Sequence, residues 1–272
     1  MRFLLLMLLA LSILSGCKDQ VNLNFDRFDK RLVIDGTIFN TDGPYYINLS
    51  YSAKYTYKPD STGGKARRVT GAQVTVSDDV GNTFLFTENS PGLYVSDKAE
   101  FKGIVERSYV LHIHTADDKI YKSSVEKLNA VAPLDSLYYE PEEGEYGLYI
   151  DMHDPPGLGN YYQWRILFNG HPNDWIDIAT DDYFDGNYLK RFYKDKGNYT
   201  HGSVIEVDQL SITRKKYKFL DLLDLQLWNG GTQFDSPAAP IVGNVYNEAD
   251  SSDYTLGYFG ASAISSKSIT IR

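Results

Sequence analysis

Two histidines with the spacing of metal ligands stand in the first half of the chain. His112 and His114 are two residues apart, and in a β-strand this spacing places both imidazoles on the same face. A zinc site needs three or four such ligands, and only Asp117 or Asp118 lies nearby in sequence. We therefore expect two surface histidines on an outward strand face and no metal site.

Three further residues that could transfer a proton precede a turn. Asp151, His153 and Asp154 form a compact group directly before Pro155. A carboxylate beside an imidazole can act as an acid–base pair, but an Asp before Pro more commonly caps a turn. We expect the turn-capping role and keep the acid–base pair as the alternative.

An acidic segment, residues 181–187, has the composition of a calcium-binding loop. It departs from the EF-hand pattern, because Tyr183 stands at the third position and Phe192 stands where the bidentate Glu of the twelfth position is required. A looser Ca²⁺ site stays open as an alternative. The sequence thus predicts no cofactor and no bound metal.

The short motifs of common enzyme classes are missing from the sequence. It contains no Gly-x-Ser-x-Gly elbow, no His-Glu-x-x-His and no phosphate loop, and Gly157-Leu158-Gly159 lacks the third glycine of a dinucleotide site. We therefore expect a protein that is not an enzyme. A hydrolase with a dispersed carboxylate pair remains an alternative, because such a pair leaves no motif.

Tyrosine is unusually frequent, with 22 residues against 13 Phe. A tyrosine ring packs while its hydroxyl stays hydrated, which suits both strands and binding surfaces. The tyrosines gather in two regions, residues 45–57 and residues 138–149, as expected of surfaces that hold a protein or glycan partner. Strand aromatics that only pack are the alternative. The candidate contact residues are Tyr45, Tyr46, Tyr55, Tyr57, Tyr138 and Tyr139.

The only cysteine, Cys17, follows a basic residue and an apolar run from Phe3 to Leu14. The run is shorter than the roughly 20 residues that span a bilayer, and it ends in Leu14-Ser15-Gly16-Cys17, the pattern of a lipobox. We predict that residues 1–16 are a signal peptide. Cleavage would make Cys17 the first residue, with fatty acyl groups such as palmitate on its thiol and on the new amino terminus. Residues 17–30 would then be a lipidated tether.

The residues that follow the cysteine indicate a location. Lys18 replaces the Asp that retains some enterobacterial lipoproteins at the inner membrane, so we expect the outer membrane. Asp19 is a partial match to the acidic tags of surface-exposed lipoproteins in Bacteroidota, which leaves the cell surface as an open alternative.

The overall charge argues against a nucleic-acid partner. The formal net charge is −9, from 27 Lys and Arg against 36 Asp and Glu, and the longest basic cluster is Arg214-Lys215-Lys216. Binding to a phosphate backbone needs clustered basic residues.

The elements that would position these residues are mostly strands. Residues 31–130 alternate β-type runs with turn signals at the spacing of an immunoglobulin-like β-sandwich. A Pro and small residues near 130–135 mark a boundary, and residues 131–272 read as a second β-rich part with one helix near 213–228. That helix has Tyr217, Leu220, Leu223 and Leu227 at helical spacing, a face expected to pack on a sheet.

Several motifs of the second part carry a family resemblance. They are Asp154-Pro155-Pro156-Gly157 with Asn160-Tyr161-Tyr162, then Tyr217-Lys218-Phe219-Leu220, Phe234-Asp235-Ser236-Pro237, Gly243-Asn244 and Leu256-Gly257-Tyr258-Phe259.

With the lipobox, this order of motifs resembles a family of Bacteroidota outer-membrane lipoproteins that bear a domain of unknown function (domain of unknown function 4249). The resemblance implies a companion of a TonB-dependent receptor and carries over no catalytic residue. We expect a non-catalytic accessory partner of such a transporter in substrate capture or uptake, with a structural or adhesive cell-envelope module as the main alternative.

Overall fold

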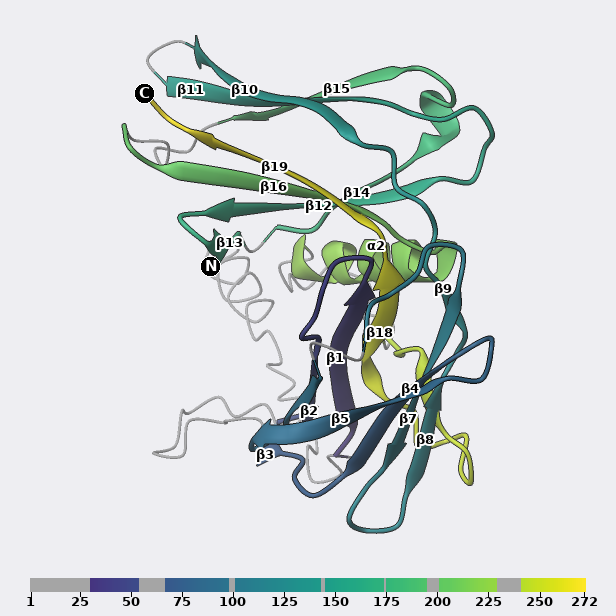
Figure 1. Ribbon diagram of the computed structural model, residues 1–272. Helices are drawn as coiled ribbons and strands as arrows, with labels where there is room; N and C mark the ends of the chain where they lie inside the picture. The colour runs from purple at the N-terminus through teal and green to yellow at the C-terminus, as the bar shows by residue number, and fades with distance from the viewer. Residues whose placement is uncertain are drawn as a thin grey trace, which may run out of the picture.

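The computed structural model describes residues 30–53, 67–97, 101–142, 145–173, 175–194, 201–228 and 241–272. Cys17, Tyr55, Tyr57 and the motif at residues 234–237 lie outside these ranges. The described chain folds into two β-sandwiches with one α-helix between them (Figure 1). The prediction of a mostly β protein, with an immunoglobulin-like sandwich followed by a second β-rich part carrying one helix, is confirmed.

The first sandwich is one long sheet that folds back on itself. Its strand order is β17-β8-β7-β4-β5-β6-β2-β1-β18, with β3 paired to β2 and β9 to β7. From the N-terminal half come β1 (Leu32–Phe39), β2 (Tyr46–Tyr51), β3 (Arg67–Arg68), β4 (Gln73–Asp78), β5 (Thr83–Ser90), β6 (Leu93–Ser96), β7 (Ser108–His114), β8 (Ile120–Ser123) and β9 (Glu126–Lys127). The C-terminal half adds β17 (Val245–Asn247) and β18 (Leu256–Ser262).

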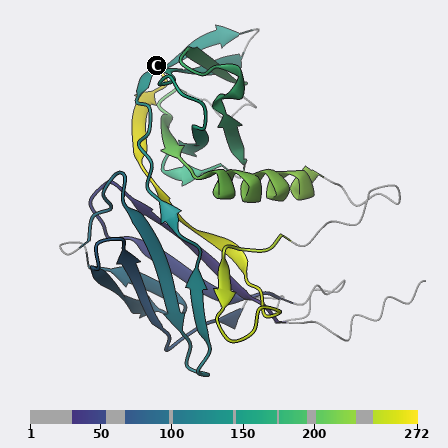
Figure 2. The same cartoon turned by 90° about the vertical axis from the view of Figure 1, so that its right-hand side faces the viewer.

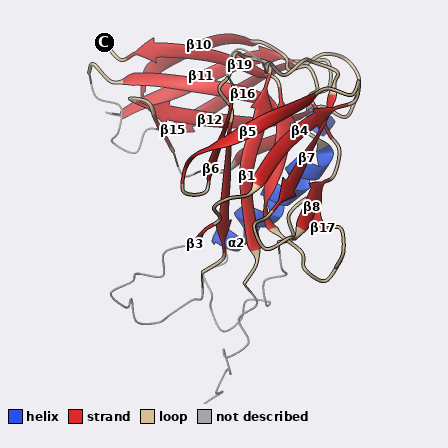
Figure 3. Ribbon diagram, turned by 60° about the horizontal axis from the view of Figure 1, so that its bottom comes forward, coloured by secondary structure: helices blue, strands red, loops and turns tan. Residues whose placement is uncertain are grey.

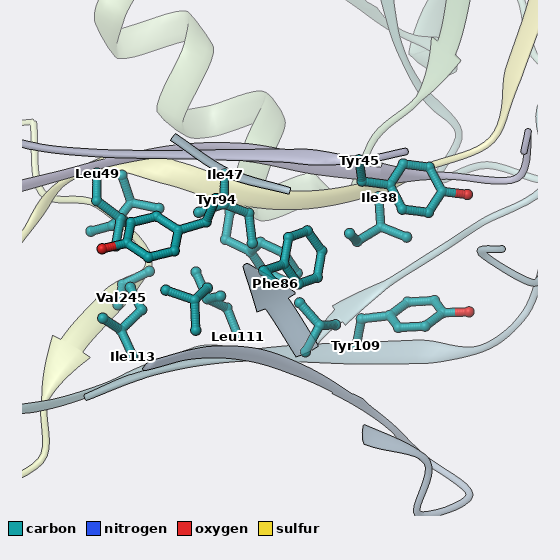
Figure 4. Close-up of a cluster of buried hydrophobic side chains, with 14 of the residues drawn as sticks. Ile38, Tyr45, Ile47, Leu49, Phe86, Tyr94, Tyr109, Leu111, Ile113 and Val245 are labelled. Carbon is teal, nitrogen blue, oxygen red and sulfur yellow. The ribbon is translucent and has the colours of Figure 1, made fainter. Parts of the chain in front are cut away.

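Alternation along the strands builds the core of the first sandwich. In β7 every second residue is buried, so that Tyr109, Leu111 and Ile113 point inward between the two layers (Figure 4). Ile47 and Leu49 of β2 meet them from the opposite layer. This period of two is the pattern that predicted the sandwich.

The second sandwich packs a three-stranded sheet against a five-stranded one. The first sheet has the order β10-β11-β15, and the second has β13-β12-β16-β19 with β14 paired to β12. The core between them holds Trp164 and Tyr162 of β12 against Leu148 and Ile150 of β11. The strands are β10 (Leu134–Glu142), β11 (Glu145–His153), β12 (Tyr161–Phe168), β13 (His171–Pro172), β14 (Asp177–Thr180), β15 (Tyr188–Lys194), β16 (Val204–Ser211) and β19 (Ile264–Thr270), with a 3-10 turn η2 (Asp181–Tyr183).

The C-terminal segment belongs to both sandwiches, which corrects the division of the chain at residue 130. β17 pairs with β8, and β18 pairs in parallel with β1, so that residues 245–262 complete the first sandwich. Only Ala263 separates β18 from β19, which pairs with β16 in the second sandwich. The chain thus returns to the first sandwich after α2 and crosses to the second sandwich again at its C-terminal end (Figure 1).

Helix α2 (Arg214–Trp228) lies in the angle between the two sandwiches (Figure 2). Thr213 caps its N-terminus, because the Thr213 hydroxyl accepts a hydrogen bond from the Lys216 amide at 3.2 Å. Leu220 is buried against Leu210 and Ile212 of the second sandwich, and Phe39 of the first sandwich packs against the same cluster. Among the described residues, no helix has the length and apolar character needed to cross a membrane.

The predicted packing face of α2 is correct only for part of its length. Leu220 is 8% exposed and Leu223 is half-buried, whereas Leu227 is 64% exposed. Leu227 lies on the same face as Leu220, since seven residues make nearly two turns. Its exposure means that the last turn of α2 extends beyond the sheet that Leu220 contacts.

Two leucine substitutions should therefore differ in their effect on stability. Leu220→Ala should lower the free energy of unfolding by about 2–5 kcal/mol, because it leaves a cavity in a buried cluster. Leu227→Ala should change it by no more than about 0.5 kcal/mol. Urea denaturation of both variants measures the difference, and equal shifts of the two midpoints would show that the last turn is packed as well.

Candidate functional site

The outward side of the β10-β11-β15 sheet carries a group of aromatic and charged side chains. Tyr138 of β10 pairs with Tyr149 of β11, and their rings stack with centroids 5.2 Å apart and planes inclined by 13°. The ammonium group of Lys190, on β15, lies 4.3 Å from the Tyr149 centroid and 5.3 Å from that of Tyr138. A hydrogen bond with Tyr138 raises the pKa of Lys190. We call Tyr138, Tyr149 and Lys190 the tyrosine face.

Acidic and imidazole groups border the tyrosine face. Ser136 donates a hydrogen bond to Asp151 at 2.6 Å, and Nδ1 of His153 lies 2.6 Å from an oxygen of Asp135. The sequence predicts Asp151 or Asp154 as the neighbour of His153, so the contact between His153 and Asp135 was not predicted. Asp135 and His153 are neighbours across β10 and β11, a pairing that no local pattern reveals.

The other predicted contact residues have different surroundings. Tyr45 is 3% exposed, and its hydroxyl donates to the carbonyl oxygen of Phe39 at 2.6 Å. Tyr45 is therefore a core residue, which corrects its prediction as a contact. Tyr46, on β2, is 51% exposed. Tyr139 is half-buried against the second core, and its hydroxyl accepts a hydrogen bond from the Arg272 amide at 2.8 Å.

Three carboxylates come together in the second sandwich, in the loops before β12 and β15. Oxygens of Asp154, Asp181 and Asp185 lie within 4.8 Å of one another. Asp181, which is fully buried, accepts hydrogen bonds from the amides of Gly159 and Asn160.

The remaining two carboxylates of this group also accept hydrogen bonds. Asp154 accepts from the Tyr162 hydroxyl at 2.5 Å and from the Gly186 amide at 3.1 Å, and Asp185 accepts from the Gly157 amide. Desolvation and the hydrogen bond to Asp154 raise the pKa of Tyr162. The carboxylates thus connect two loops, which is a wider structural role than the turn cap predicted for Asp154.

A cavity of about 540 Å³ lies where the two sandwiches meet. Glu106 of the first sandwich and Asp154 of the second both line it, together with the connecting segment 129–133. Glu106 forms an ion pair with Lys127 at 2.6 Å, and the hydrogen bond from Lys127 lowers its pKa. Both carboxylates therefore have structural partners.

A buried carboxylate holds the first sandwich to α2. Glu126 of β9 is fully buried, and it accepts hydrogen bonds from the Tyr258 hydroxyl at 2.7 Å, the Thr213 hydroxyl at 2.8 Å and the Asn244 amide at 3.3 Å. Burial raises the pKa of the Glu126 carboxyl, while these donors and the charge of Lys216 oppose the rise. The Glu126 carboxylate lies at the N-terminal end of α2, where the helix dipole also favours a negative charge.

Lys216, in the first turn of α2, carries a positive charge, opposite to that of Glu126. It is 8% exposed, and its ammonium group lies 3.3 Å from the Thr37 hydroxyl of β1. Burial lowers the pKa of Lys216 to about 8, and the charge of Glu126 opposes this shift. We call Glu126, Thr213, Lys216, Asn244 and Tyr258 the junction cluster.

The motif at residues 154–157 lies with the three carboxylates of the second sandwich, whereas the motifs at residues 217–220, 243–244 and 256–259 meet at this junction. Asn244 also donates to the Phe259 carbonyl at 2.8 Å, and the ring of Tyr258 lies 5.0 Å from that of Phe219. Gly257 has a φ of +78°, and a Cβ there would lie 2.0 Å from the Ile34 carbonyl oxygen, so only glycine fits. The role of the motifs at this junction among the described residues is to join α2 and β18 to the rest of the fold.

The two histidines of β7 share a face, as their spacing predicted. His112 lies 3.0 Å from the Ser77 hydroxyl, and burial lowers its pKa. His114 lies 3.3 Å from Asp118. Each imidazole thus has its own neighbour, and no further group that could ligate a metal gathers around the pair among the residues searched.

These observations define a class of protein: two β-sandwiches joined through one helix and a buried polar junction. Residues 18–268 match the model of a family described as Domain of unknown function (DUF4249). The chain belongs to this family, which confirms that part of the resemblance drawn from the motifs.

Two further comparisons add little. No curated protein matches the sequence. Among solved structures, the chain is similar to a segment of two fibronectin type-III domains from chicken tenascin, with 11% identity over 68% of this chain and 92% of that chain and a TM-score of 0.22. At this TM-score the likeness supports no further argument.

Proposed function

We propose that the protein is a lipid-anchored, non-catalytic component of the bacterial outer membrane. In this proposal it serves as the accessory partner of a TonB-dependent transporter and helps to capture or pass on the transported substrate. The motif-based resemblance to Bacteroidota lipoproteins supports the choice of partner.

The observation that carries the proposal is the sequence around Cys17. A basic residue, an apolar run and small residues precede this single cysteine, and residues 18–30 connect it to the first sandwich. These thirteen residues reach at most about 45 Å when fully extended, so the folded body would stay close to the membrane. A partner embedded in the same membrane then gains effective concentration for docking.

The tyrosine face is the surface that best fits a protein partner. Tyrosine is among the residues enriched at the centres of protein interfaces. Tyr138 and Lys190 lie on the outer sheet of the second sandwich, away from the first sandwich that follows the tether (Figure 1). Lys190 is exposed and Tyr138 is half-buried, whereas Tyr149 is only 9% exposed, so Tyr138 and Lys190 are the members of the tyrosine face that a neighbour would contact.

The test is affinity isolation of the full-length protein from membranes in mild detergent. A TonB-dependent receptor should co-purify in near-stoichiometric amount, and Tyr138→Ala should reduce its yield at least several-fold. Tyr183→Ala is the matched control, because Tyr183 is 96% exposed and lies outside the tyrosine face. Deletion of the gene should also impair uptake of one class of nutrient.

Two outcomes would contradict the proposal. Isolation of the intact lipoprotein without a receptor, together with normal growth of the deletion strain on every nutrient that the receptor imports, would favour a structural or adhesive envelope module. Equal receptor yields from the Tyr138 and Tyr183 variants would exclude the tyrosine face as the docking surface.

A further inference from the structure

Helix α2 exposes three leucines in its last two turns. Leu222 is 48% exposed, Leu225 is 54% exposed and Leu227 is 64% exposed. Val242, on the segment that leads to β17, is 50% exposed. Leu222 and Val242 line the same groove, and Leu225 lies three residues from Leu222 on the same side of the helix. Exposed apolar residues that lie together commonly mark an interaction surface. We call Leu222, Leu225 and Val242 the leucine surface.

The leucine surface lies on the outside of α2. Leu227 does not belong to it, because Leu227 lies on the packing face of the helix, beyond the sheet that Leu220 contacts. Leu222 and Leu225 lie three residues apart on a side of the helix that includes Lys218. The fold of the described residues therefore leaves apolar side chains exposed at the end and on the outside of the helix.

Basic residues and a shallow apolar groove continue this surface. A groove of about 290 Å³ runs between α2 and residues 241–244, with Phe219 and Ile241 among its apolar lining. Lys215 and Lys218 also line it. Leucines beside lysines are typical of helices that lie in the interface of a membrane, where lysine stems cover apolar surface and the ammonium groups reach the headgroups.

A second group of cations lies where the tether enters the fold. The ammonium group of Lys30 is 3.2 Å from the centroid of the Tyr51 ring, and the guanidinium group of Arg31 is 4.0 Å from that of Tyr254. Tyrosines paired with basic residues are the side chains that gather at the level of lipid headgroups. The guanidinium group of Arg31 also donates to the Ser252 carbonyl oxygen at 2.7 Å and lies 3.8 Å from an Asp253 carboxylate oxygen. Lys30, which is exposed, is therefore the cation of this group that can reach a lipid.

The leucine surface and the start of β1, which follows Lys30, lie on the same side of the molecule. The C-terminal end of α2 and the start of β1 are on the same side in two views (Figures 2 and 3). A tether of at most about 45 Å, attached at that start, keeps this side within reach of the bilayer that holds Cys17.

We propose that the leucine surface, together with Lys215, Lys218 and Lys30, rests on the lipid headgroups of the membrane to which Cys17 is anchored. The leucines would enter the boundary between headgroups and acyl chains, and the cations would contact lipid phosphates. The proposal rests on the lipid anchor of the proposed function and goes beyond it, since it orients the body on the bilayer.

A bilayer fits this surface better than a second copy of the chain. A second copy would have to bring its own cluster of Lys215 and Lys218 close to that of the first, which like charges oppose. Lipid phosphates complement these lysines, and the tether places the bilayer close by. Association of two copies of the chain through this surface is therefore a result that the test must distinguish from membrane binding.

The test is a fluorescence measurement on the lipidated protein in vesicles of phosphatidylethanolamine and phosphatidylglycerol. Acylation consumes the thiol of Cys17, so Leu225→Cys provides one site for an environment-sensitive dye. Lipids brominated on their acyl chains should quench this dye at least several-fold more than in the control Leu85→Cys. Leu85 is 62% exposed and lies on β5 of the first sandwich.

The alternatives give different results. Equal, weak quenching at both positions in protein that floats with the vesicles would overturn the proposal. A dye that is already shielded in detergent, and more so at higher protein concentration, would indicate a second copy and overturn it as well. No receptor is present in the measurement, so a failure here leaves the transporter proposal standing, and a failure to isolate a receptor leaves this result unchanged.

Discussion

Glu126→Gln should lower the free energy of unfolding by about 1–3 kcal/mol, because an amide cannot accept all the hydrogen bonds that the buried carboxylate accepts. The substitution removes one of the two carboxylates, Glu126 and Asp35, whose negative charge opposes the lowering of the Lys216 pKa. It also puts an amide where the Tyr258 and Thr213 hydroxyls now donate to a carboxylate. Urea denaturation measures the effect.

A control variant and a double variant test whether the loss of stability comes from the buried charges. Glu106→Gln changes the same chemical group in an exposed ion pair with Lys127, and its urea midpoint should stay close to that of the wild-type protein. Glu126→Gln combined with Lys216→Met should lose less stability than the sum of the two single variants, because no unpaired charge remains buried. Strictly additive losses would show that the two residues do not interact.

The pH dependence of stability supplies an independent measurement of the same pair. The pKa of Lys216 is about 8 in the folded protein against 10.5 in an unfolded chain. Between these values the unfolded chain binds more protons, so the contribution of Lys216 to the free energy of unfolding rises with pH. Lys216→Met should remove that rise, and a rise of the same size in the variant would place the titration elsewhere.

Cys17→Ala should abolish membrane attachment through lipid. Cys17 is the only cysteine, so no other thiol can take the acyl group. Two or more acyl chains hold a protein on a bilayer far more firmly than the marginal binding of one, at roughly 0.8 kcal/mol per buried CH₂. The variant should accumulate as an uncleaved or mislocalised precursor that incorporates no labelled fatty acid.

The matched control for this substitution is Lys18→Ala, which leaves the sequence from Leu14 to Cys17 intact. It should be cleaved and labelled like the wild-type protein. Fatty-acid label on the Cys17→Ala variant, or its normal recovery with outer membranes, would show that the cysteine is not the point of attachment.

Local patterns in the sequence determined much of the architecture. The alternation of Tyr109, Leu111 and Ile113 with polar neighbours predicted β7 and its buried face, because side chains in a strand alternate between two sides. The helical spacing of Tyr217 and Leu220 predicted α2 over residues 213–228, and the helix spans Arg214–Trp228. These features depend on neighbours in the chain, which a sequence displays directly.

Other features depend on which segments meet in space, and only the tertiary structure decided them. The return of β18 to pair with β1 joins Val33 to Leu256, a contact that no short-range signal encodes. The exposure of Leu227 depends on where the neighbouring sheet ends, which helical periodicity does not contain.

For the candidate sites too, the sequence shows some features, and only the tertiary structure shows the others. The single cysteine, the tyrosine-rich segments and the acidic loop at residues 181–187 are visible in the sequence. The convergence of Asp154 with Asp181 and of Glu126 with Lys216 is not, because each pair joins distant segments. Sequence determined which side chains exist and which strands and helix carry them. Strand pairing and helix docking decided which of them meet, because burial of apolar faces selects contacts without regard to distance along the chain.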